Sequence, residues 1–244
     1  MIRPDAARPV VGVSLKAYFP LARARSWLRE AAAVVPDSVE FFAAPSYLAI
    51  PDAVAAFPHG TAAQDVSAEE PGPFTGEVTA AELAEAGVRY VEIGHAERRR
   101  LYGDTDEVVA AKTAAALRHG IVPVLCVGET VDPGDGGPDP AAVAVAQLRS
   151  ALEGAPAGRV IVAYEPVWAI GAAEPASDDH IRTVAAALRD ARREPHDAVV
   201  YGGSAGPGLL TRLGDAVDGV FLGRFAHDVT ALRAVVEEAV ALRS

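Results

Sequence analysis

Three residues that can move protons or stabilise charge each follow a short apolar run of the kind that forms a buried strand. Lys16 follows VVGVSL, His95 follows YVEIG, and Glu165 follows VIVAY. Carboxylates and imidazoles exchange protons with reacting groups, and an ammonium group stabilises negative charge that develops beside it. The three residue types together indicate proton-transfer chemistry.

Glycine-rich turns follow two further apolar runs. Gly202-Gly203-Ser204 comes after AVVY, and Gly223-Arg224 comes after GVFL. Backbone N–H groups that such turns expose before a helix bind anions such as phosphate. Combined with the proton-transfer residues, these turns indicate a small phosphorylated molecule as the ligand.

The strands that must position these residues are eight nearly continuous runs of Val, Ile, Leu, Phe and Ala. Strands that are covered on both faces of a parallel sheet show this pattern. The runs span residues 10–15, 39–43, 60–63, 90–93, 121–127, 160–163, 198–201 and 219–222.

Alanine-rich segments with apolar residues at helical spacing lie between these runs. Asp106 and Ser177 are expected N-caps, and Gly120 is expected just beyond a helix end. The predicted helices span residues 21–34, 106–119, 141–153, 178–192 and 228–242.

Eight strand–helix pairs in 244 residues predict a closed (β/α)₈ barrel, which typically needs about 250 residues. No Pro/Gly/Ser-rich linker divides the chain, so residues 1–244 are expected to form a single domain; the turn-rich segment 132–140 is expected to be a surface loop. An open doubly wound sheet is the alternative. That fold normally has a glycine-rich phosphate turn after its first strand, where this chain has LKAY (15–18).

The composition excludes several classes of protein. The net charge of −11, from 22 basic and 33 acidic residues, argues against a nucleic-acid-binding surface. The one cysteine, Cys126, cannot form an internal disulfide, which favours a reducing cytoplasm; within its apolar run it is expected to pack rather than react. No apolar run reaches the roughly 18 residues of a membrane span, and residues 1–9 do not resemble a signal peptide.

Four motifs resemble, in order, those of the triosephosphate isomerase family. They are YVEIGHAERR (90–99), VPVLCVGE (122–129), AYEPVWAIG (163–171) and YGGS (201–204). The similarity runs roughly from residue 10 to residue 235. It implies a (β/α)₈ barrel that interconverts dihydroxyacetone phosphate and glyceraldehyde 3-phosphate through an enediolate, without a metal or an organic cofactor.

The resemblance also implies a role for each proton-transfer residue. Glu165 would be the general base, and His95 the neutral electrophile at the start of a short helix, which disfavours the imidazolium form. Lys16, one of only two lysines in the chain, would place positive charge on the enediolate and the phosphate. Glu97 would lie close to Lys16 behind the reacting groups.

The phosphate site and the subunit contact follow from the same resemblance. The backbone N–H of Gly171, in a lid of residues 169–176, would bind phosphate together with Ser204 and the Gly223-Arg224 turn. FTGE (74–77) resembles the loop by which the family forms homodimers. The segment 65–79, with Thr75 near its tip, would then reach the partner's active site.

Four positions depart from the family pattern. Ser14 and Asp65 stand where asparagine is usual, residues 172–175 (AAEP) replace Thr-Gly-Lys in the lid, and Arg224 replaces the second glycine of a Gly-Gly pair. The chain contains no asparagine at all, so drift in composition explains the first two. The lid and Arg224 favour the alternative that the chain is a paralogue with a remodelled pocket beside Ser14, which isomerises four-carbon erythrulose phosphates by the same chemistry.

Two other classes compete with an isomerase. A Schiff-base aldolase would use Lys16 as nucleophile and needs a lysine with a depressed pKa, but it has no need of the histidine and the glutamate. A non-catalytic phosphate-binding relative would explain the altered lid, but not the retention of Lys16, His95 and Glu165.

Overall fold

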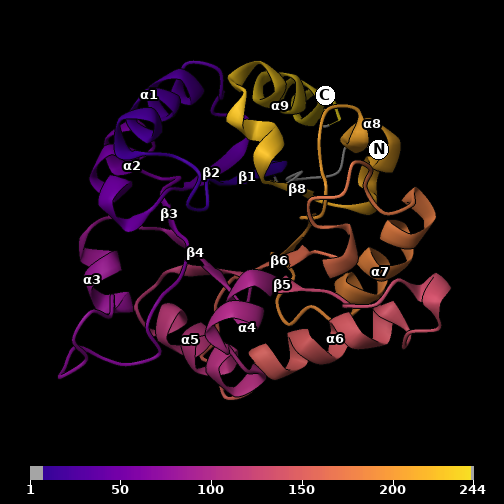
Figure 1. The fold of residues 1–244 in the computed structure, drawn as a ribbon, viewed down its shortest axis with the longest axis horizontal. Coiled ribbons are helices and arrows are strands. Elements are labelled where there is room, and N and C mark those ends of the chain that lie inside the picture. The colour runs from indigo at the N-terminus through magenta and orange to yellow at the C-terminus, as the bar shows by residue number, and fades with distance from the viewer. Residues whose placement is uncertain (1–7, 243–244) are drawn as a thin grey trace.

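Within residues 8–242, eight parallel strands form the centre of the molecule, and helices surround them in a ring (Figure 1). The structure is a computed structural model that describes residues 8–242, the side chain of Pro133 excepted. The strands are β1 (Val10–Ser14), β2 (Glu40–Ala44), β3 (Ala62–Ala63), β4 (Tyr90–Ile93), β5 (Val122–Val127), β6 (Ile161–Tyr164), β7 (Ala198–Tyr201) and β8 (Gly219–Leu222). The helices are α1 (Leu21–Ala32), α2 (Ile50–Ala56), α3 (Ala80–Glu85), α4 (Ala96–Tyr102), α5 (Asp106–Arg118), α6 (Pro140–Ala151), α7 (Asp178–Asp190), α8 (Leu209–Leu213) and α9 (Val229–Ala241).

The sheet closes on itself. Its strands are hydrogen-bonded in the order β2-β1-β8-β7-β6-β5-β4-β3, and every neighbouring pair is parallel. A parallel bridge between Ala43 and Thr61 joins β2 to the residue before β3. The Ala43 N–H also donates to the carbonyl oxygen of Gly60, at 2.9 Å. The single (β/α)₈ barrel is therefore confirmed, and the open doubly wound sheet is excluded.

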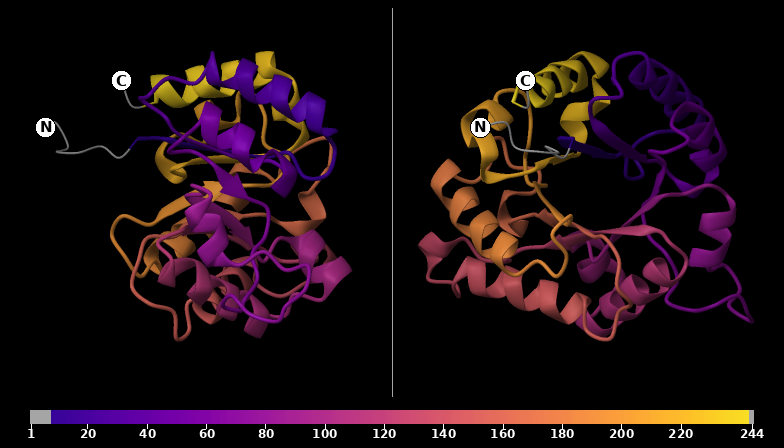
Figure 2. Two further views of the ribbon diagram at one scale, coloured as in Figure 1. Left: turned by 90° about the vertical axis from the view of Figure 1, so that its left-hand side faces the viewer. Right: turned by 180° about the vertical axis from the view of Figure 1, so that it is seen from behind.

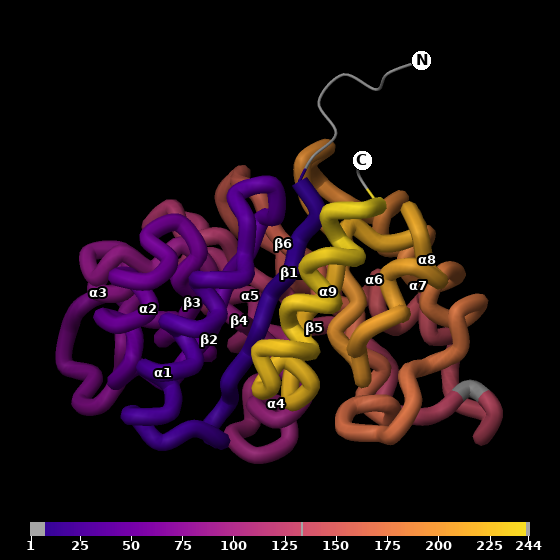
Figure 3. Tube along the Cα trace, turned by 90° about the horizontal axis from the view of Figure 1, so that it is seen from above, coloured from indigo at the N-terminus to yellow at the C-terminus, as the bar shows by residue number. Residues whose placement is uncertain are grey.

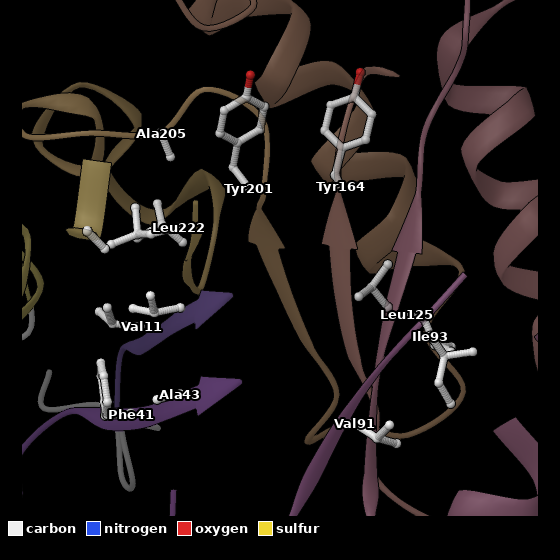
Figure 4. Close-up of a cluster of buried hydrophobic side chains, with 14 of the residues drawn as sticks. Val11, Phe41, Ala43, Val91, Ile93, Leu125, Tyr164, Tyr201, Ala205 and Leu222 are labelled. Atoms are coloured by element: carbon white, nitrogen blue, oxygen red, sulfur yellow. The ribbon is translucent and has the colours of Figure 1, made fainter. Parts of the chain in front are cut away.

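Alternation along each strand separates an inner from an outer apolar layer. On β5, for example, Val124 and Cys126 belong to the inner cluster, whereas Leu125 and Val127 belong to the cluster that includes the helices. Figure 4 shows part of the outer layer, with Val11, Val91 and Leu125 among the labelled side chains. Because both faces are covered, the strands read as continuous apolar runs. Cys126 is buried as expected.

Helix ends match the predicted caps in two of three cases. The Ser177 side chain accepts a hydrogen bond from the His180 N–H, and Gly120 adopts a φ of +70° beyond the end of α5. The prediction for Asp106 is wrong, because Thr105 caps this helix by accepting from the Val108 N–H and Asp106 is the first helical residue. A carboxylate is favourable there as well, since the N-terminus of a helix attracts negative charge.

All strand carboxyl ends meet at one rim. Figure 3 shows β1 running toward the edge of the barrel at which α4, the helix that follows β4, is found. The connection between β3 and α3 projects away from the barrel (Figures 1 and 2). It contains the exposed residues Phe74 and Thr75. No helix within residues 8–242 is long and apolar enough to cross a membrane.

Candidate active site

One cavity of about 680 Å³ at this rim gathers the residues that the sequence singles out. Its walls include the three proton-transfer residues and all the predicted binding residues: Ser14, Lys16, His95, Glu97, Glu165, Gly171, Ser204, Gly223 and Arg224. Thr75 is exposed and does not line the cavity of its own chain.

His95 is held as a neutral imidazole. Its Nδ1 accepts a hydrogen bond from the Glu97 N–H at 3.1 Å, which leaves the proton on Nε2. Burial and the nearby Lys16 ammonium lower the pKa of His95 to about 4. The Nε2 atom lies 3.5 Å from Oε2 of Glu165. The ring therefore offers an N–H beside the carboxylate at neutral pH.

Glu165 has the environment of a general base. Burial, followed by the negative charge of Glu92, raises the pKa of its carboxyl group well above the ordinary value. Its buried Oε2 has no hydrogen-bond partner within residues 8–242. A Cβ at position 202 would lie 2.6 Å from Cγ of Glu165, so only Gly202 leaves room for this side chain. The unpartnered oxygen is free to accept a proton from a ligand.

Lys16 has an unusual backbone conformation and is held in place by a hydrogen bond and an ion pair. It has a φ of 47°, a left-handed conformation that is uncommon outside glycine. Nε2 of Gln64 donates to the Lys16 carbonyl oxygen at 2.9 Å, and the Lys16 Nζ lies 2.9 Å from Oε1 of Glu97. Burial, the largest single influence, lowers the pKa of this ammonium, but the hydrogen bond and charge of Glu97 together with the charges of Glu165 and Glu92 raise it overall. A raised pKa is the opposite of what a Schiff-base nucleophile needs.

Donors gather at the outer part of the cavity. The backbone N–H groups of Gly171, Ser204 and Gly223 donate to no protein group within residues 8–242. The Ser204 hydroxyl lies 2.9 Å and 2.8 Å from the carbonyl oxygens of Ala169 and Ala172. Nη2 of Arg224 donates to the Gly171 carbonyl oxygen at 3.2 Å. The Ser204 and Arg224 side chains thus hold the segment that the sequence identifies as a lid.

Both ends of the lid segment are anchored by buried side chains. Nε1 of Trp168 donates to Oε1 of Glu129 at 2.8 Å, and the Tyr164 hydroxyl donates to the same carboxylate. At the other end, the Ala176 N–H donates to the Tyr201 hydroxyl oxygen at 3.1 Å. The two tyrosines end β6 and β7, so the lid is tied to the barrel rim.

Sequence reasoning missed Glu92, whose side chain also lines the cavity. The Ser14 hydroxyl donates to Oε2 of Glu92 at 2.9 Å. The signal was present, because a carboxylate inside an apolar run that forms a buried strand needs a reason to be there. No cluster of three or more His, Cys, Asp or Glu that could hold a metal occurs in the described part of the chain.

The family comparison agrees with this geometry. The sequence model of the triosephosphate isomerase family matches residues 9–239. The chain belongs to the triosephosphate isomerase family. The predicted sugar-phosphate isomerase on a barrel is thereby confirmed, and the aldolase and the non-catalytic binder are set aside.

Individual relatives within the triosephosphate isomerase family carry two names. An L-erythrulose-1-phosphate isomerase of Pectobacterium atrosepticum is 44% identical over 96% of this chain and 96% of its own length. A triosephosphate isomerase of Citrifermentans bemidjiense is 40% identical over 88% of this chain and 92% of its own. A triosephosphate isomerase of Cupriavidus taiwanensis is 47% identical, over 64% of this chain and 66% of its own.

Proposed function

We propose that this chain isomerises a small ketose phosphate by proton transfer through Glu165. The observation that carries the proposal is the neutral His95, held 3.5 Å from an otherwise unpartnered oxygen of Glu165. Glu165 removes a proton from the carbon beside the carbonyl group. The same carboxyl group then returns a proton to the former carbonyl carbon, which moves the carbonyl along the chain.

His95 and Lys16 stabilise the enediolate between the two steps. The Nε2–H of His95 donates to the enediolate oxygens and passes a proton from one to the other. Lys16 supplies positive charge in a site whose burial strengthens that attraction. Its ion pair with Glu97 at 2.9 Å holds the ammonium group in place and leaves it protonated.

The substrate's phosphate binds at the donor-rich outer part of the cavity. The free N–H groups of Gly171, Ser204 and Gly223 supply hydrogen bonds, and Arg224 adds positive charge. Closure of the lid 169–176 over the phosphate excludes water from the enediolate.

Within this proposal, a four-carbon erythrulose phosphate is the preferred substrate. Similarity to the L-erythrulose-1-phosphate isomerase extends over 96% of both chains. The polar pair of Ser14 and Glu92 beside the reacting residues also suits a longer polar substrate. Dihydroxyacetone phosphate is the second candidate, because the same three proton-transfer residues serve it and several relatives are named triosephosphate isomerases.

The proposal extends to assembly and location. Residues 1–244 form a single barrel domain. Two copies of the chain form a homodimer through the projecting segment 65–79, in which Thr75 contacts the partner. A cytoplasmic location is supported by the single buried thiol of Cys126.

The assignment is tested by steady-state kinetics with both ketose phosphates. Wild-type protein is compared with Glu165→Gln and with Glu153→Gln, which changes an exposed glutamate far from the cavity. Glu165→Gln should lower kcat by about 10²-fold or more, because the amide cannot act as a base. Glu153→Gln should match the wild type. Unchanged turnover by Glu165→Gln would contradict the assignment of the base.

A further inference from the structure

Glu92 is a buried carboxyl group in the cavity that the proposed mechanism does not use. Its residue is 4% exposed. One oxygen, Oε2, accepts from the Ser14 hydroxyl at 2.9 Å. The other, Oε1, lies 3.9 Å from Nε2 of His95, beyond hydrogen-bond distance. Within residues 8–242 Oε1 has no hydrogen-bond partner, and Glu92 is one of the residues that line the ligand cavity.

The cavity is polar in two different ways at its two ends. Gly171 and Arg224 lie exposed at the outer end, where the donors gather. Ser14 and Glu92 are almost fully buried at the inner end, and together they present oxygen atoms. A substrate whose phosphate occupies the outer end, and whose reacting carbons lie against His95 and Glu165, would direct its remaining atoms toward this inner pair.

We propose that Glu92, together with Ser14, binds the terminal hydroxymethyl group that a four-carbon ketose phosphate has and a three-carbon one lacks. Glu92 is then a specificity-determining residue. This inference rests on the proposed function, because it presupposes that the cavity isomerises ketose phosphates.

The protonation of Glu92 suits this role. Burial raises the pKa of its carboxyl group to about 7, despite the opposing hydrogen bond from Ser14 and the charge of Lys16. A neutral carboxyl group both donates to and accepts from a hydroxyl group. The ionised form, whose charge raises the pKa of Glu165, still accepts a hydrogen bond from the same hydroxyl group. The other charged groups that influence it, Glu97 and Asp65, would favour the same neutral form.

The site would favour the four-carbon over the three-carbon substrate because the shorter substrate leaves polar groups of the cavity without hydrogen-bond partners. A site built to hydrogen-bond a hydroxyl group loses those bonds with an analogue that lacks it. The terminal hydroxyl of a four-carbon substrate would satisfy Oε1 of Glu92. Dihydroxyacetone phosphate ends one carbon earlier and leaves that oxygen without a partner.

The test measures kcat/KM for L-erythrulose 1-phosphate and for dihydroxyacetone phosphate in Glu92→Val, a change to an apolar side chain of similar volume. The value for the four-carbon substrate should fall by about 10- to 100-fold. At a pH above the acidic limb, where Glu165 is ionised in wild type and variant alike, the value for the three-carbon substrate should stay within about 3-fold, since this substrate does not reach Glu92 in the productive complex. Ser14→Ala, a smaller change that keeps the strand intact, should lower the four-carbon value selectively by about 10-fold.

Glu40→Gln is the matched control. Glu40 is another carboxylate inside the barrel, but it lies at the opposite end, where it pairs with Arg159 at 2.6 Å. Its substitution should leave the ratio of the two kcat/KM values unchanged.

The outcomes separate this inference from the proposed function. Equal loss on both substrates in Glu92→Val and Ser14→Ala would overturn the inference and leave the isomerase assignment standing, because Glu92 would then act through Glu165 or His95. Wild-type activity on dihydroxyacetone phosphate alone would overturn the four-carbon assignment and this inference with it. Wild-type inactivity on both would overturn the proposed function itself.

Discussion

Burial has opposite effects on the two groups that meet in the cavity. It lowers the pKa of His95, because the charged form of an imidazole is a cation, and it raises the pKa of Glu165, because the charged form of a carboxyl group is an anion. At neutral pH His95 is therefore kept in its neutral form, and Glu165 holds a proton more tightly than a carboxylate in water does. In the proposed mechanism, the same buried environment prepares His95 as the electrophile and Glu165 as the base.

The pH dependence of turnover should report this environment. Glu165 acts as a base only when ionised, so its raised pKa places the acidic limb of kcat above the ordinary range of a glutamate, near 4.5. Removal of the neighbouring negative charge in Glu92→Gln should move that limb to lower pH. A pH profile of kcat at saturating substrate checks both statements, and an acidic limb that Glu92→Gln leaves in place would contradict the second.

Glu92 should also make stability depend on pH. Its folded-state pKa, about 7, lies above the ordinary 4.5, so the folded protein prefers the protonated form. The stability that Glu92 contributes is fully present below about pH 4.5 and is lost as the pH rises through 7. The difference between the two pKa values corresponds to about 3 kcal/mol of unfolding free energy. The free energy of unfolding of Glu92→Gln minus that of wild type should therefore be larger at pH 8 than at pH 5. Urea denaturation at both pH values measures the gain, and an equal difference at both would contradict it.

The segment 169–176, the proposed lid, contains the longest of the four departures from the expected family pattern. Its ends are anchored through Glu129 and Tyr201, while its middle contacts the barrel through Ser204 and Arg224. The Arg224 guanidinium donates to the Gly171 carbonyl oxygen, and in the proposed mechanism it also adds positive charge where phosphate binds.

Arg224→Gly should weaken phosphate binding more than it slows chemistry. Loss of a charge-assisted contact predicts a KM about 5- to 10-fold higher, and similarly weaker inhibition by inorganic phosphate. Arg224→Lys keeps the positive charge and should lie between the two proteins. Inhibition constants for phosphate measure the effect, and identical constants in all three proteins would show that Arg224 does not face the phosphate.

The sequence predicts the long elements well and the short ones poorly. Apolar runs as long as that of β5 are recognisable in the sequence as buried strands. The two residues of β3 and the five of α8 are too few to show a pattern. The positions of Lys16, His95 and Glu165 were predictable, because barrel topology brings strand ends to one rim. The contact between Ser14 and Glu92 was not, since it joins residues 78 positions apart through side-chain directions that the sequence does not contain.

The whole molecule is acidic, yet its proposed ligand is an anion. With a net charge of −11, attraction of a phosphate must come from local groups at the rim. Lys16 and Arg224 supply positive charge there, and backbone N–H groups supply dipoles that add no net charge. Higher salt should therefore affect substrate binding less than in a protein that attracts anions by its overall charge.

The proposed homodimer depends on the projecting segment 65–79. Its tip exposes Phe74, which is 39% accessible, and Thr75 beside it. Light scattering at micromolar concentration should give twice the 25.2 kDa mass of one chain. Thr75→Arg should give a monomer with reduced activity, since a bulky charge at the tip cannot enter the partner. A monomeric wild type would contradict the proposed homodimer.

Proton abstraction by Glu165 is tested most directly by running the isomerisation of L-erythrulose 1-phosphate in D₂O and following it by proton NMR. A carboxyl group that carries the proton between carbons exchanges it with solvent. The account predicts that deuterium enters the product at the carbon that was the carbonyl carbon of the substrate, and that Glu165→Gln abolishes this uptake. Product formed without any deuterium at that carbon would show a direct hydride shift and contradict the account.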